Sequence, residues 1–244
     1  MVIVTLAAAP AAAHVAPSVD DNNRYLKLTP LGDRVRFAYT VFFGEVPGAG
    51  ERSSIDANHD GQITDAEAHG FGEKLAAEVG AQIDLEIDGH GQPVKWTIID
   101  VGMGTSTVNA GSFSVDLVAW LCLPTVRGTH RITLRDHFRI PHAGETEVKV
   151  EDSPGVTITS AHVGPADDPS YDFRFVGLGG PLADDGLALA FTAGDKATVT
   201  ADGACTAATT SPPGSRQKII AYSIGGFVVL MTIVGFILRR IRLR

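Results

Sequence analysis

The sequence predicts a mainly β protein, in which an antiparallel, sandwich-like domain carries one loop–helix insertion and precedes a single C-terminal transmembrane helix. Three observations lead to this fold class. Short runs with apolar alternation recur about every ten residues between positions 24 and 191, separated by Gly, Pro and Asp. One segment has helical periodicity, and one long apolar segment without charges lies near the C-terminus.

The first predicted strands lie in residues 24–44, RYLKLTPLGDRVRFAYTVFFG, around a turn at Gly32-Asp33. Residues 65–83 then predict a helix, because Phe71, Leu75, Val79 and Ile83 recur at every fourth position. A second hairpin is expected from residues 83–87 and 94–101, around the turn at residues 88–91. The remaining predicted strands are residues 113–122, 131–134, 146–150, 156–160, 171–176 and 187–191.

The N-terminal segment, residues 1–13, predicts a signal peptide that lacks the usual basic n-region. It reads MVIVTLAAAPAAA, and Ala11 and Ala13 satisfy the A-x-A pattern, so that cleavage would leave His14 as the first residue. Residues 14–200 then form the domain outside the membrane. Residues 201–218, rich in Ala, Thr, Ser and Pro, are expected to be a linker.

Residues 219–238, IIAYSIGGFVVLMTIVGFIL, predict the membrane anchor. They contain no charge, and as a helix they rise about 30 Å, enough to cross the hydrocarbon core. The basic tail, residues 239–244, follows at once and by the positive-inside rule stays in the cytoplasm. We therefore expect a single-pass protein of the cell membrane whose N-terminal domain is periplasmic or extracellular.

Charge in this chain is unevenly distributed. All 28 acidic residues lie between Asp20 and Asp202, whereas six of the 20 Lys and Arg lie at or after Arg216. The region before Arg216 therefore holds 14 basic against 28 acidic side chains. Such a surface repels nucleic acid and attracts cations, which argues against DNA or RNA as a partner. The abundance of Ala, Gly and Arg relative to Lys suggests a bacterial origin.

Residues 56–67, DANHDGQITDAE, fit the EF-hand calcium loop at each constrained position. Calcium takes six to eight oxygen ligands in a flexible shell, and this pattern supplies them at fixed positions. Gly61 allows the sharp bend, and Ile63 is expected to anchor the loop to the core. The candidate ligands are Asp56, Asn58, Asp60, Gln62 through its main-chain carbonyl, Thr64 and Glu67.

Two features qualify this interpretation. An Asp- and Asn-rich turn that only caps the following helix is the alternative, although a cap alone requires neither Gly61 nor Glu67. Pro47, Gly48 and Gly50 precede the loop and predict a short first helix, and no second loop of this kind is present in the sequence. We therefore expect a fixed structural site rather than a sensor, with an affinity on the order of 10⁻⁴ to 10⁻³ M.

Residues 14–89 resemble the extracytoplasmic domain of bacterial nickel/cobalt transporter relatives and hydrogenase/urease accessory membrane proteins. The shared features are a mature N-terminus at His14, a hairpin holding GDRVRFAYTV, the segment GEVPG, the D-x-N-x-D-G-x-x-T-x-x-E loop, an amphipathic helix and a strand ending in DG. The resemblance implies the calcium-loop roles given above. It also implies a membrane transporter or another envelope protein as a partner, although those relatives have several membrane helices.

Two classes of function follow from these features. The first is a membrane-anchored calcium-binding protein that acts as a binding or interaction module. The second is an accessory domain for nickel, cobalt or copper, in which the free amino group and imidazole of His14 would chelate the metal. Motifs of nucleophilic or nucleotide-dependent enzymes are absent, so an enzyme is not expected. Cys122 and Cys205 either pair as a disulfide or remain free thiols.

Overall fold

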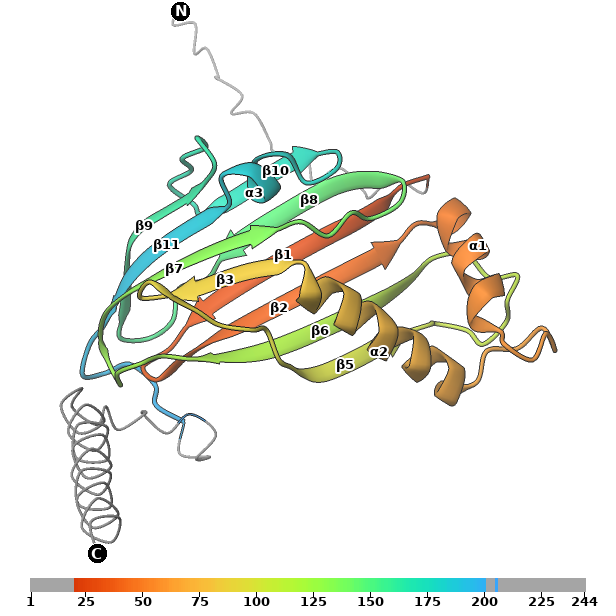
Figure 1. The fold of residues 1–244 in the computed structure, drawn as a ribbon, viewed down its shortest axis with the longest axis horizontal. Helices are drawn as coiled ribbons and strands as arrows, with labels where there is room; N and C mark the ends of the chain where they lie inside the picture. The colour runs from red at the N-terminus through yellow and green to blue at the C-terminus, as the bar shows by residue number, and fades with distance from the viewer. Residues whose placement is uncertain (1–19, 201–204, 206–244) are drawn as a thin grey trace, which may run out of the picture. The chain divides into compact units, whose positions relative to one another are not determined.

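The computed structural model describes residues 20–200 and Cys205 (Figure 1). The predicted signal peptide (1–13), His14, the anchor (219–238), the tail (239–244) and all of the linker (201–218) except Cys205 lie outside these residues. Within the described part of the chain, no helix is both long and apolar enough to cross a membrane.

The described domain is mainly β and consists of two sheets, as the sequence predicts. The six-stranded sheet has the order β10 (Asp172–Val176), β8 (Ala143–Val150), β1 (Asn22–Pro30), β2 (Arg34–Phe43), β6 (Phe113–Cys122), β5 (Trp96–Gly102). The five-stranded sheet has the order β4 (His90–Gly91), β3 (Ile83–Ile87), β7 (Gly128–Asp136), β11 (Leu187–Ala193), β9 (Val156–Val163). The pairing is antiparallel except between β1 and β8, which run parallel.

A single core lies between the two sheets. Alternate residues of β2 point inward, from Val35 to Phe43, and are buried together with residues of the other sheet such as Ile132 and Leu189. This period of two explains why the strands were predictable, because the inward positions of β2 are consistently apolar, whereas its outward positions are mixed and include Arg36 and Thr40. A short helix, α3 (Gly180–Asp184), was not predicted; it buries Leu182.

The prediction of a hairpin from residues 83–101 is wrong. β3 pairs with the two-residue strand β4 and with β7, whereas β5 pairs with β6 in the other sheet. The reason is that β5 is covered by the helix α2 (Asp65–Ala81). The Nε1 atom of Trp96 donates to the carbonyl of Ala76 at 2.8 Å, and a Cβ atom at Gly72 would lie only 2.7 Å from Val101.

The helix preceding the loop, α1 (Glu45–Ile55), has 11 residues and is longer than the sequence indicated. Pro47 does not interrupt it, because this residue lies in the first turn, where a main-chain N–H needs no partner. Gly48 is buried, and a Cβ atom there would lie 3.2 Å from the carbonyl of Gly111. The helix therefore packs closely on the segment before β6 instead of ending early.

A buried ion pair connects the two sheets. The guanidinium of Arg24 on β1 lies 2.6 Å from the carboxylate of Asp136 on β7, and both side chains are almost completely buried. The hydroxyl of Tyr39 on β2 donates to the same carboxylate at 2.8 Å. Burial raises the pKa of Tyr39 well above its ordinary value, so that this hydroxyl keeps its proton.

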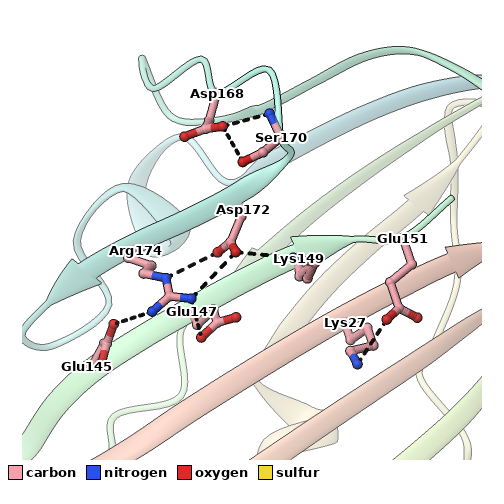
Figure 2. Close-up of polar contacts among 9 residues, drawn as sticks. All are labelled: Lys27, Glu145, Glu147, Lys149, Glu151, Asp168, Ser170, Asp172 and Arg174. Carbon is pink, nitrogen blue, oxygen red and sulfur yellow. Dashed lines mark hydrogen bonds and ion pairs between the residues drawn. The ribbon is translucent and has the colours of Figure 1, made fainter. Parts of the chain in front are cut away.

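A second set of ion pairs covers the outer face of β10, β8 and β1 (Figure 2). Arg174 lies 3.3 Å from Asp172 and 3.3 Å from Glu147, and Lys149 lies 3.2 Å from Asp172. Partial burial opposes ionisation of Asp172, but hydrogen bonds from Arg174 and Lys149 outweigh it and lower the pKa of this carboxyl. These contacts tie the edge strand β10 to its neighbour.

A disulfide joins Cys122, the last residue of β6, to Cys205. Of the two possibilities that the sequence left open, the structure has the paired one. The two Cα atoms are 5.2 Å apart, although 83 positions separate the cysteines in the sequence. The bond therefore attaches the chain beyond β11 to the six-stranded sheet.

We expect Asp136→Asn to lower the free energy of unfolding by about 3–5 kcal/mol, because it leaves the buried Arg24 charge uncompensated. The matched control is Glu151→Gln, which removes the exposed pair with Lys27 seen in Figure 2 and should cost less than about 1 kcal/mol. Urea unfolding of both variants measures the difference, and equal losses would contradict the role assigned to the buried pair.

The lowered pKa of Asp172 predicts a pH effect. Its ionised form stabilises the fold above the ordinary aspartate pKa, and this stabilisation is lost as the pH falls through the lower pKa of the folded state. Asp172→Asn should therefore lose less stability than the wild type between neutral and acidic pH. Thermal melts of both proteins across this range measure the difference, and equal losses of stability would contradict the role assigned to Asp172.

Candidate metal centre

The predicted calcium loop, residues 56–67, connects α1 to α2, so the segment is a helix–loop–helix unit (Figure 1). The six candidate ligands therefore lie in the connection between the helices and in the first turn of α2, which begins at Asp65. Ile63 is buried at 4 % exposure within the core, which confirms its predicted role as an anchor. Ile55, at the end of α1, is buried in the same core, so the loop is fixed at both sides by apolar contacts.

The first half of the loop is wrapped around the carboxylate of Asp56. Its two oxygens accept hydrogen bonds from the main-chain N–H groups of Asp60, at 3.2 Å, and Gly61, at 2.9 Å. The side chain of Asn58 bridges to Asp60 in both directions, accepting from its N–H at 2.9 Å and donating to its carboxylate at 3.1 Å. The side chains of Asp56, Asn58 and Asp60 are thus collected on one side of the turn.

Two backbone positions in this turn have a left-handed conformation, with φ of 59° at His59 and 83° at Gly61. A Cβ atom at Gly61 would meet no other atom within 4 Å, so glycine is required there for its backbone freedom and not for space. This agrees with the bend that the sequence pattern assigns to Gly61. His59 adopts the same region at a cost that its neighbours must offset.

The second half of the loop is closed by Glu67. One of its oxygens accepts from the N–H of Ala57 at 3.0 Å, across the start of the loop, and the other accepts from the N–H and hydroxyl of Thr64 at 2.9 and 2.8 Å. Thr64 is the N-cap of α2, and the two residues form a capping box. The main-chain and side-chain hydrogen bonds from Thr64 lower the pKa of the Glu67 carboxyl.

The helix-capping alternative accounts for only part of this arrangement. Thr64 and Glu67 cap α2, whereas the hydrogen bonds of the Asp56, Asn58 and Asp60 side chains lie within residues 56–62. Capping of α2 therefore does not involve these three side chains, whose oxygens accept hydrogen bonds from the main-chain N–H groups of residues 60–62. A calcium shell formed by the same oxygens stays a prediction of the sequence pattern.

The donor set fits calcium by its chemistry: three carboxylates, an amide, a hydroxyl and a main-chain carbonyl, all oxygen. As the side chains stand, however, no three His, Cys, Asp or Glu side chains among residues 20–200 and Cys205 are grouped so as to hold a metal ion. The carboxylates of Asp56, Asp60 and Glu67 are instead used as acceptors for main-chain N–H groups. Calcium tolerates irregular shells, which matches a loop with this freedom.

The histidines of the described domain do not form a second centre. His130 lies 2.8 Å from Asp88, His137 lies 3.0 Å from Asp84, and His69 lies 3.4 Å from Glu73. Each of these pairs stands apart, and His14, the candidate ligand for nickel or copper, lies outside the described residues.

The loop has a structural partner that sequence reasoning missed. The segment between β5 and β6, residues 103–112, pairs with this loop through two main-chain hydrogen bonds. The N–H of Ile63 donates to the carbonyl of Ser106 at 2.6 Å, and the N–H of Val108 donates to the carbonyl of Gly61 at 3.2 Å. The hydroxyl of Ser106 also donates to the side-chain oxygen of Gln62 at 2.9 Å. Gly, Ser, Thr and Asn dominate this segment, and nothing in its sequence signals the pairing.

Comparison of the chain with protein-family models and with curated protein sequences finds no match.

We expect Gly61→Ala to lower the free energy of unfolding by about 1–2 kcal/mol, because an alanine must adopt the left-handed conformation. Gly70→Ala in α2 is the matched control. Its new methyl group would also meet no atom within 4 Å, but alanine is favoured in a helix, so this variant should gain about 0.5–1 kcal/mol. Urea unfolding measures both changes, and a neutral Gly61→Ala variant would contradict the geometry of the turn.

Proposed function

We propose that this protein binds one Ca²⁺ in loop 56–67 and acts as a membrane-anchored, extracytoplasmic binding or interaction module. The observation that carries the proposal is the gathering of Asp56, Asn58 and Asp60 at alternate positions of one turn, closed from the other side by Glu67. The membrane anchor and the extracytoplasmic location rest on residues 1–13 and 219–238 of the sequence. The excess of acidic side chains before Arg216 favours cation binding on the same side.

The packing of the helices supports a structural site and not a sensor that opens. Phe71 of α2 packs against Phe43 and Phe113, and its ring centroid lies 5.8 Å from the centroid of each. The rings of Phe43 and Phe113 are stacked, with their centroids 4.5 Å apart. An opening motion of α2 would expose this cluster to water, at a cost of several kcal/mol in apolar burial. Within this function, calcium stabilises the end of the sandwich where the two helices meet.

The proposal predicts that calcium raises the melting temperature of the full chain. With a dissociation constant on the order of 10⁻⁴ to 10⁻³ M, 10 mM Ca²⁺ adds about 1.4–2.7 kcal/mol to the free energy of unfolding. Glu67→Gln should abolish the gain, because it removes the charged bidentate ligand. Glu73→Gln, on the exposed face of the same helix, should retain the full gain in the same calorimetric melts.

A gain that Glu67→Gln retains would place any calcium elsewhere. The absence of a gain in the wild type, with no heat on titration, would remove the proposed function.

A further inference from the structure

Arg52, near the end of α1, is a completely buried cation that has no carboxylate partner among residues 20–200. Its side chain has 0 % exposure, and its guanidinium donates to five main-chain carbonyls instead. Burial without a counter-ion lowers the pKa of this arginine from its ordinary value. The five acceptors belong to one segment, residues 103–112: Met103, Thr105, Thr107, Gly111 at 2.9 Å and Ser112 at 3.3 Å.

For five carbonyls within ten residues to reach one guanidinium, residues 103–112 must curl around the Arg52 side chain. The guanidinium also lies over the ring of Phe113, 5.5 Å from its centroid, at the start of β6. Arg52 therefore determines the shape of residues 103–112 from the inside, and the outer edge of this curl is the edge that pairs with the calcium loop.

The pairing reaches the positions that matter most for a bound ion. The carbonyl of Gly61, the residue that sets the bend of the turn, accepts a hydrogen bond from Val108. The N–H of Ile63 donates to Ser106, and this N–H belongs to the same peptide group as the carbonyl of Gln62, a candidate ligand. The side chain of Gln62 is held between the carbonyl of Gly61, at 3.1 Å, and the hydroxyl of Ser106. The loop between β5 and β6 thus restrains the middle of the calcium loop, where no second calcium loop is present among the described residues.

We propose that Arg52 is a positioning residue for the calcium site: it shapes residues 103–112, which in turn hold Gly61, Gln62 and Ile63 in the conformation that binds the ion. The inference rests on the proposed calcium function. A restrained loop loses less conformational freedom when it binds, so its affinity is higher than that of a loop free to move. Residues that orient metal ligands typically change the affinity about ten- to hundred-fold when altered.

The test is calorimetric titration of the full chain with Ca²⁺, comparing Arg52→Lys with Arg24→Lys. Lysine keeps the charge but has three donors, so it cannot hold five carbonyls. Arg24→Lys also alters a buried arginine and lowers stability, but between the two sheets, away from the loop. We expect Arg52→Lys to weaken calcium binding about ten- to hundred-fold and Arg24→Lys to bind as the wild type does.

Wild-type affinity in Arg52→Lys, or equal weakening in both variants, overturns the inference, since Arg52 would then act on global stability alone. Wild-type protein that binds no calcium removes the proposed function, and the inference with it. If Arg52→Lys does not fold, Ser106→Ala is the second variant, because it removes only the exposed hydroxyl that holds Gln62. It should weaken binding about fivefold, and unchanged affinity there overturns the inference.

Discussion

A guanidinium sealed from water must have all its donors satisfied, and at Arg52 this requirement organises one end of the molecule. In the described part of the chain no carboxylate pairs with it, and five carbonyls of residues 103–112 converge on it instead, which holds this polar segment in place. That segment connects β5 to β6 and pairs with the loop between α1 and α2. The helix–loop–helix unit is therefore joined to the sandwich by polar contacts as well as by Ile55 and Ile63.

The sandwich supplies the rigid base for this unit. The ion pair between Arg24 on β1 and Asp136 at the end of β7 connects the two sheets. The helix α2 covers β5, the edge strand of the six-stranded sheet (Figure 1). A loop placed on such a base is restrained by Ile55 and Ile63, which are buried in the core on either side of it. This favours a site that adds stability over one that switches shape.

Most of the fold was predictable because it follows local rules. Outward and inward residues alternate in β1, β2 and β6, and the helix after the loop has a regular apolar spacing, so both appear directly in the sequence. The strand that pairs with β5 could not be predicted from such local patterns. Apolar alternation indicates that a side chain is buried, but it does not identify the element against which that side chain packs. The sequence predicts a shorter α1 because Pro and Gly disfavour helices as residue types, whereas the positions of Pro47 and Gly48 in the first turn decide their effect.

The candidate site also has one part that the sequence pattern indicates and one part that it does not. The twelve residues of the predicted calcium loop carry their own spacing in the sequence, and in the structure they connect α1 to α2 and form the first turn of α2. Arg52 and residues 103–112 have no such pattern, because their role depends on main-chain carbonyls brought together by the fold, which side-chain identities do not encode. The parallel pairing of β1 with β8 was missed for the same reason, since it depends on contacts between residues about 120 positions apart.

The most direct measurement is a crystal structure of the full chain grown with calcium, with anomalous scattering used to locate the ion. We expect one calcium per chain inside the turn, bound by oxygens of Asp56, Asn58, Asp60, Gln62, Thr64 and Glu67, with residues 103–112 unchanged around Arg52. An ordered loop whose carboxylates still accept only main-chain N–H groups at saturating calcium, or an ion bound at another place, would contradict it.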